Sequence, residues 1–450
     1  MRLIKNTTWC LLVAALAIAS PSCGKDDPAT EPTPTPGGNT GTDPNPNPNP
    51  TPDDPKPTEG VFAPEDAKQH VENTAMKFMN LFDAADQQRL ADLAEYVADR
   101  YGELHRPYGW ETDDSYYAPA AFVSAAARMY RTASYAPLSR SVYTYRFADY
   151  AGIYEPGSYR WEKTGTSDDV IFRFAGKRGA CELKATASTD GWEATYDDDD
   201  YGDRYTGTVP RLIHITLTEG GTTLADISVE SKVDFDMATA DIKVNATVMN
   251  LAAEVTFSGT DTRLTEQQTL KINGNVCQTS TATVNGYNML RENTIRRLAN
   301  ESLKPADVFA GASGTVDILG ALQVRGEVAH FSSIASIADD LDYNAWEWGV
   351  YTKSDAERLC RTFCDKVNAN VDTRVYFNGT DAVQAIGVTL PYYYEYSDGE
   401  WYWEAHLGLR YVSDNSTQDF DAFLDNYDTT SVENRFTSLV RAYRRLWDIF

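Results

Sequence analysis

Apolar and polar side chains alternate along many short segments between residues 142 and 412, and this period of two is the feature that most constrains the fold. Successive side chains of a strand point to opposite faces of a sheet, so alternation places one row in a core and the other in solvent. Asp190-Gly191, Gly220-Gly221 and Asp398-Gly399 fall between such segments and favour hairpin turns. The sequence predicts a meander of antiparallel strands over residues 142–147, 170–174, 182–187, 212–217, 225–233, 242–248, 315–328, 373–377, 383–396 and 401–412.

Apolar residues at three- and four-residue steps predict helices before, between and after these strands. Pro64 suits a first helical turn, and Ser354-x-x-Glu357 and Thr430-x-x-Glu433 match the pattern of a capping box. We expect an α+β fold, with N-terminal helices followed by long antiparallel β-meander sheets and by interspersed and C-terminal helices. The predicted helices cover residues 64–82, 90–102, 119–130, 288–301, 354–367 and 430–450.

The first 22 residues have the parts of a secretory signal peptide, with Arg2 and Lys5 before an apolar segment over residues 9–19. That segment is shorter than the roughly 20 residues that span a bilayer. Ser20-Pro21-Ser22-Cys23 is similar to a lipobox and predicts lipid attachment at Cys23, whereas Ala17-Ile18-Ala19 would suit ordinary secretory cleavage. We favour lipid attachment, because Gly24-Lys25-Asp26-Asp27 after the cysteine resembles a surface-export signal of Bacteroides-type lipoproteins.

The segment that follows is rich in Pro, Asn, Thr, Asp and Gly and has no large apolar residue that could start a core before the folded part. Its prolines favour an extended tether. The predicted organisation is a signal peptide over 1–22, a disordered tether over 23–60, a helical segment over 61–135, an antiparallel β-rich region over 136–285 and an α+β region over 286–450.

A net charge of −26 argues against nucleic acid as a partner. The sequence has no phosphate loop, dinucleotide fingerprint or nucleophile elbow, and its five histidines are not spaced as metal ligands. We therefore expect no enzymatic activity, no catalytic or metal-binding residues and no cofactor. His214 lies between two isoleucines of a predicted strand and is expected on the polar face. The acidic segment 197–203 suits a solvated loop, with weak calcium binding as the alternative.

Four cysteines follow the lipidation site, and an exported protein meets an oxidising environment. Cys360 and Cys364 lie four residues apart on the apolar side of a predicted helix, which favours core packing. A disulfide involving either of them, or Cys181 or Cys277, is the alternative, and the sequence does not select a pairing.

An aromatic hairpin is the strongest candidate binding site. Tyr392-Tyr393-Tyr394-Glu395-Tyr396 and Trp401-Tyr402-Trp403 flank a predicted turn, and alternation leaves aromatic rings on both faces of the hairpin. One face is expected in the core, while an exposed face beside acidic residues would suit stacking on sugar rings. The candidate ligand-binding residues are Tyr394, Tyr396, Trp401 and Trp403, and the alternative is cross-strand packing that stabilises the sheet.

Three segments, residues 147–154, 209–218 and 373–386, resemble uncharacterised cell-surface lipoproteins of Bacteroides-type bacteria. The resemblance covers most of residues 140–450 and implies an outer-membrane location, with the protein anchored by lipid and exposed at the cell surface. We expect a non-catalytic binding or structural role, with an extracellular glycan or protein as ligand. A surface glycoside hydrolase and a carrier of an apolar ligand in a curved sheet are the alternatives.

Overall fold

A computed structural model describes residues 61–81, 84–101, 142–197, 204–291, 294, 297, 303–333, 352–377, 381–395 and 401–419. The predicted signal peptide, lipidation site and tether, the helices at 119–130 and 430–450, and nearly all of the acidic segment 197–203 lie outside the described residues. None of the described helices is long and apolar enough to cross a lipid bilayer.

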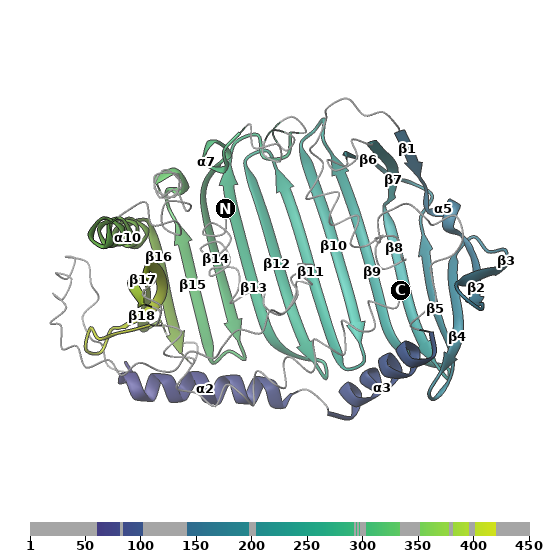
Figure 1. The fold of residues 1–450 in the computed structure, drawn as a ribbon, viewed down its shortest axis with the longest axis horizontal. Coiled ribbons are helices and arrows are strands. Elements are labelled where there is room, and N and C mark those ends of the chain that lie inside the picture. Colours follow the sequence, from purple (N-terminus) through teal and green to yellow (C-terminus); the bar gives the residue numbers. More distant parts are fainter. Residues whose placement is uncertain are drawn as a thin grey trace.

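Within the described residues, one mixed sheet of sixteen strands dominates the molecule (Figure 1). The strand order is β19-β18-β17-β16-β15-β14-β13-β12-β11-β10-β9-β8-β5-β4-β2-β3. These strands are β2 (Gly152–Pro156), β3 (Trp161–Gly165), β4 (Val170–Gly176), β5 (Gly179–Ala187), β8 (Leu212–Glu219), β9 (Thr222–Asp234), β10 (Thr239–Val248), β11 (Leu251–Thr260), β12 (Arg263–Ile272), β13 (Asn275–Gly286), β14 (Phe309–Ile318), β15 (Leu322–Val328), β16 (Val371–Phe377), β17 (Val383–Glu395), β18 (Trp401–Tyr411) and β19 (Thr417–Asp419).

Most neighbouring strands are antiparallel, as the alternation predicts, but the meander is interrupted at one place. β5 pairs with β8, because β6 (Gly191–Asp197) and β7 (Arg204–Pro210) leave the large sheet and form a small one with β1 (Val142–Tyr145). The predicted hairpin turn at Asp190-Gly191 therefore does not join paired strands. β2–β4 and β1–β7 are parallel pairs.

The turn at Gly220-Gly221 is a two-residue connection between β8 and β9, as predicted. Both glycines have positive φ, 57° and 81°, which is the backbone of the turn that matches the twist of two paired strands. The sheet also runs without interruption through the expected boundary at residues 285–286, because β13 pairs with β14 over nine residues of β13. The fold is thus β-rich and built on one continuous sheet.

Two helices lie end to end along one end of the strands (Figure 1). They are α2 (Pro64–Asn80) and α3 (Ala84–Tyr101), and each begins and ends near its predicted bounds except that α3 starts earlier. Ala67 and Val71 of α2 pack against β15, β16 and β17, while Leu93 and Val97 of α3 pack against β4, β5 and β8. Both helices contact the apolar face of the sheet.

The third long helix, α10 (Lys353–Asn370), packs on the same apolar face over β17 and β18. Short helices among the described residues include α5 (Phe147–Tyr150) and α7 (Pro305–Val308). The predicted capping box at Ser354 and Glu357 is wrong by two residues. Thr352 is the N-cap, with extended backbone, and its hydroxyl accepts a hydrogen bond from the Asp355 N–H at 3.2 Å. A threonine followed three residues later by a short carboxylate therefore begins the helix.

The four described cysteines are all buried and carry free thiols. Cys360 and Cys364 lie in the contact between α10 and the sheet, together with Phe363 and Val367, as the core-packing interpretation expects. Burial and the neighbouring Glu219 raise the pKa of Cys181 to about 12, so that thiol stays protonated near neutral pH.

Candidate functional site: a polar groove and an aromatic stack on one sheet face

The two faces of the large sheet differ in chemistry. On the apolar face, Ile213 and Ile215 of β8 and Val229 of β9 are buried, and the helices and the small sheet pack there. On the opposite, polar face, His214 sits between those isoleucines and bonds to Asp226 at 3.0 Å, which confirms its predicted placement. The strand register shows that the polar face continues from β5 to β16.

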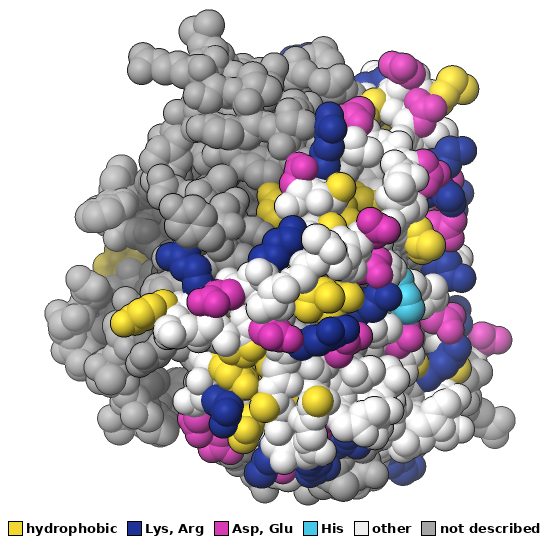
Figure 2. Space-filling model, turned by 90° about the vertical axis from the view of Figure 1, so that its right-hand side faces the viewer, with side chains coloured by type: hydrophobic (Ala, Val, Ile, Leu, Met, Phe, Trp, Pro, Cys, Tyr) yellow, Lys and Arg dark blue, Asp and Glu magenta, His cyan; other side chains and the backbone are white. Residues whose placement is uncertain are grey.

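Charges on the polar face are complementary over β8 to β12. Glu230 lies directly opposite Lys243, and Lys232 lies opposite Asp241. The Lys271 ammonium contacts the Glu254 carboxylate at 2.6 Å, and this hydrogen bond lowers the pKa of Glu254. Acidic and basic side chains are also interspersed over the described surface at the β3 end of the molecule (Figure 2).

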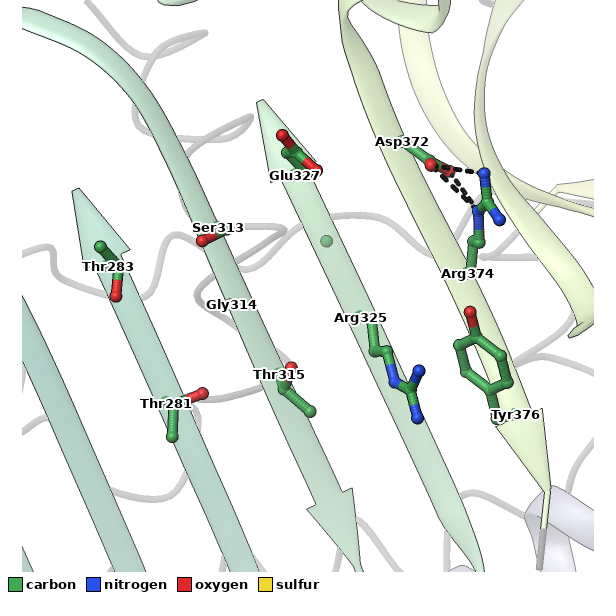
Figure 3. Close-up of a pocket in the computed structure, with 11 residues that line it drawn as sticks. Thr281, Thr283, Ser313, Gly314, Thr315, Arg325, Glu327, Asp372, Arg374 and Tyr376 are labelled. Carbon is green, nitrogen blue, oxygen red and sulfur yellow. Dashed lines mark hydrogen bonds and ion pairs between the residues drawn. The ribbon is translucent and has the colours of Figure 1, made fainter. Parts of the chain in front are cut away.

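Between β13 and β16 the same face carries a groove of about 440 Å³ (Figure 3). Its lining combines short hydroxyl side chains of β13 and β14 with longer charged and aromatic side chains of β15 and β16. The lining residues are Thr281, Thr283, Ser313, Gly314, Thr315, Arg325, Gly326, Glu327, Asp372, Arg374 and Tyr376.

Like charges lie opposite each other on β15 and β16, two adjacent strands that line this groove. Arg325 lies directly opposite Arg374, and Glu327 lies directly opposite Asp372. Opposite residues of antiparallel strands have Cα atoms about 5 Å apart, and like charges in that position destabilise a sheet. These four side chains are solvent-exposed, so water reduces the repulsion. Even so, these opposed like charges do not stabilise the sheet.

The four charges are not equivalent. Arg374 donates from Nε to both oxygens of Asp372 at 2.9 Å, which raises the pKa of Arg374 and fixes both side chains (Figure 3). Arg325 lies 4.3 Å over the ring of the buried Tyr376 and donates to Gln323. Within the described part of the chain, neither Arg325 nor Glu327 has an oppositely charged partner. Arg325 and Glu327 both line the groove, where they supply a hydrogen-bond donor and an acceptor.

The register also orders the hydroxyls. Thr281, Thr315, Arg325 and Arg374 form one row across four strands, and Thr283, Ser313, Glu327 and Asp372 form the next. Two residues along a strand separate the rows by about 7 Å. One row ends in hydrogen-bond donors and the other in acceptors. A ligand with many hydroxyl groups can bond to both rows, because each hydroxyl donates and accepts.

The predicted aromatic hairpin forms, but its rings divide between the two faces. Trp403 pairs with Tyr393, and Trp401 pairs with Glu395, so both tryptophans face α10. Lys353 of α10 lies 5.6 Å from the Trp401 ring, and Arg361 lies 5.6 Å from the Trp403 ring. Tyr394 lies on the polar face. The sequence analysis grouped Tyr394 with Trp401 and Trp403 in one candidate site. This grouping is corrected, because Tyr394 lies on the opposite face of the sheet from the two tryptophans and cannot contact the same sugar ring.

On the polar face, Tyr394 belongs to an aromatic stack that the sequence analysis did not assemble. Tyr392 stacks on His406 with ring centroids 4.5 Å apart and planes 3° apart. The His406 ring bonds to the Tyr394 hydroxyl at 3.1 Å and to Asp419 at 2.8 Å. Burial opposes protonation of His406, but hydrogen bonds with Glu404 and Asp419 outweigh it and raise the pKa. Tyr396 and Cys23 lie outside the described residues.

Sequence reasoning missed the groove for a definite reason. Alternate positions of β15 and β16 are polar, which marks a solvent-facing row, but nothing in the sequence says that these two strands pair.

Within the described residues, no three acidic, histidine or cysteine side chains lie close enough to hold a metal ion. Comparisons of this chain with protein-family models, curated proteins and solved structures found no match.

Proposed function

We propose that this protein is a lipid-anchored protein of the outer membrane, exposed at the cell surface, and that it binds a neutral glycan in the groove between β13 and β16. The carrying observation is the register, which places Arg325 opposite Arg374 and Glu327 opposite Asp372 on a face whose other opposed charges are complementary. Like charges in opposed positions do not stabilise a sheet, which supports a role in binding.

Charge favours a neutral ligand. The two guanidinium groups and two carboxylates of the groove cancel, and the whole chain carries −26, which repels polyanions at long range. The polar lining disfavours an apolar ligand, since each buried polar group would lose its water without a new partner. A glycan supplies hydroxyls to both rows.

We also propose that the protein belongs to the α+β class, with α2 and α3 as its N-terminal helices.

The binding proposal is tested with the purified chain against dextran, laminarin, mannan and arabinoxylan, with polygalacturonate and heparin as anionic probes. Arg325→Ala should weaken binding to the neutral probe at least tenfold, because a hydrogen bond from a charged donor contributes about 1.5–3 kcal/mol. Lys243→Ala, on the same face in β10, is the matched control and should bind normally. Binding of anionic probes alone, or equal losses in both variants, would overturn the proposal.

The lipid anchor rests on Cys23 and the acidic residues after it. In a bacterial host that processes lipoproteins, Cys23→Ala should move the protein from the membrane fraction to the soluble fraction and abolish incorporation of labelled palmitate. Stable anchoring takes more than one acyl chain, so loss of the only modified cysteine should release the protein completely. Unchanged labelling of the variant would exclude Cys23 as the lipid site.

A second candidate is glycan hydrolysis by Glu327 and Asp372. These carboxylates lie opposite each other on β15 and β16 and both line the groove, and a retaining glycosidase uses two neighbouring carboxyl groups. Asp372, fixed by Arg374, would be the nucleophile and Glu327 the acid. Release of reducing ends from the bound polysaccharide, lost in Glu327→Gln, would favour this function over simple binding.

A further inference from the structure

We infer that Tyr392 is a second sugar-contact site on the same face, so that the ligand of the groove is a glycan chain of about four or more residues rather than a single sugar. This inference rests on the proposed function and adds the length and direction of the bound chain to it.

Tyr392 is the exposed ring of a rigid stack. Its side chain is 42% exposed, although one face of the ring lies on His406. His406 is itself 8% exposed and is held by Asp419 and the Tyr394 hydroxyl. A ring supported in this way loses little conformational freedom when a ligand binds, which favours affinity.

The register places Tyr392 and the groove on one face. Ile386 of β17 lies opposite Arg374, and Tyr392 is six residues further along, an even number that returns to the same side. At about 3.3 Å per residue, Tyr392 is about 20 Å along β17 from the position opposite Arg374, a length on the order of four sugar units. Figure 1 shows β17 and β18 turned out of the plane of the central strands, so the chain would follow the curve of the sheet.

The surface between the two positions is apolar and partly exposed. Ile386, Val388 and Leu390 alternate along β17 on this face and are each half-buried. Gly408 lies opposite Val388 and adds no side chain there. The C–H faces of sugar rings suit such a path, and an aromatic ring at its end suits stacking, because the negative face of the ring attracts the polarised C–H groups.

The test uses malto-, cello-, laminari- and manno-oligosaccharides of two to eight residues, titrated against the purified chain. Wild-type affinity for the series that binds should rise at least tenfold between two and about five residues and then level off. Tyr392→Ala should abolish that rise and leave the affinity for the disaccharide unchanged. Tyr392→Phe should behave as wild type, because it keeps the stacked ring.

Two controls separate this inference from the proposed function. Tyr287→Ala removes a tyrosine that is 65% exposed and lies outside both sites, and it should change nothing. Arg325→Ala should weaken every chain length equally. Affinity that does not increase beyond the disaccharide would overturn the Tyr392 inference and leave groove binding intact. Absence of binding by every oligosaccharide and by the neutral polysaccharides would overturn both.

Discussion

The polar face of the sheet contains two regions with the same architecture that differ in how charged residues lie opposite one another. Over β8 to β12, acidic and basic residues lie opposite or diagonal to one another, as in Glu230 with Lys243 and Glu254 with Lys271. Over β13 to β16, arginine lies opposite arginine and a carboxylate opposite a carboxylate, beside a row of small hydroxyl residues. The strands, the pairing and the exposure to solvent are alike in both regions.

The difference supports our proposal that the charges over β8 to β12 stabilise the sheet and that the region over β13 to β16 binds a ligand. Complementary cross-strand pairs each contribute up to about 1 kcal/mol to a sheet, and like pairs cost a similar amount. A region that gives up this contribution keeps polar groups available for a ligand. The groove is found in the region with like pairs, which connects the charge pattern to the shape of the surface.

The largest loss of stability should come from a substitution on the apolar face of the sheet. Trp403→Ala removes a ring packed under α10 and should reduce the free energy of unfolding by about 2–4 kcal/mol. Tyr392→Ala, on the opposite face of the same hairpin, should cost about 1 kcal/mol or less, the value of an aromatic stack. Urea denaturation of both variants measures the difference. Equal losses would contradict the division of the hairpin into a face packed on α10 and a polar face that carries Tyr392.

Matched charge reversals test the comparison directly. Glu230→Lys places a lysine opposite Lys243 and should destabilise the protein by about 1 kcal/mol. Glu327→Lys places a lysine opposite Asp372 and should leave stability unchanged or raise it by about 0.5 kcal/mol, while neutral-glycan binding is lost. Thermal unfolding and glycan titration of the two proteins give both quantities. A destabilised Glu327→Lys protein would show that the like pairs are harmless to the sheet.

The smallest effect should be the pH dependence that His406 adds. Its pKa is raised in the folded protein, so its contribution to stability is fully present below the ordinary histidine pKa of about 6.5. That contribution is lost as the pH rises through the higher pKa of the folded state. Asp419→Asn removes one of the carboxylates that raise the pKa of His406. The stability difference between wild type and Asp419→Asn should be larger at pH 5.5 than at pH 8.5, as measured by urea denaturation.

The sequence predicted part of the sheet, because alternation is a local property of an extended backbone. It did not predict β2, β3, β6, β7, β11, β12, β13 or β19. It assigned His214 to the polar face correctly and found the hairpin that carries Tyr392 and Trp403. It did not find the departure of β6 and β7 into a second sheet, because the alternation of a strand does not name its neighbour. The cap of α10 was predicted two residues late, since two threonine or serine positions fit the pattern and backbone conformation selects one.

The amino-acid sequence by itself determined that this chain forms many amphipathic strands and which residues of each strand share a face, and it predicts a lipoprotein signal at the N-terminus. Only the tertiary structure decided that β15 lies beside β16, although 42 residues separate Val328 from Val371 along the chain. That pairing places Arg325 against Arg374 and Glu327 against Asp372. Long-range strand pairing depends on the packing of the whole apolar face, and so the groove exists only in the folded sheet.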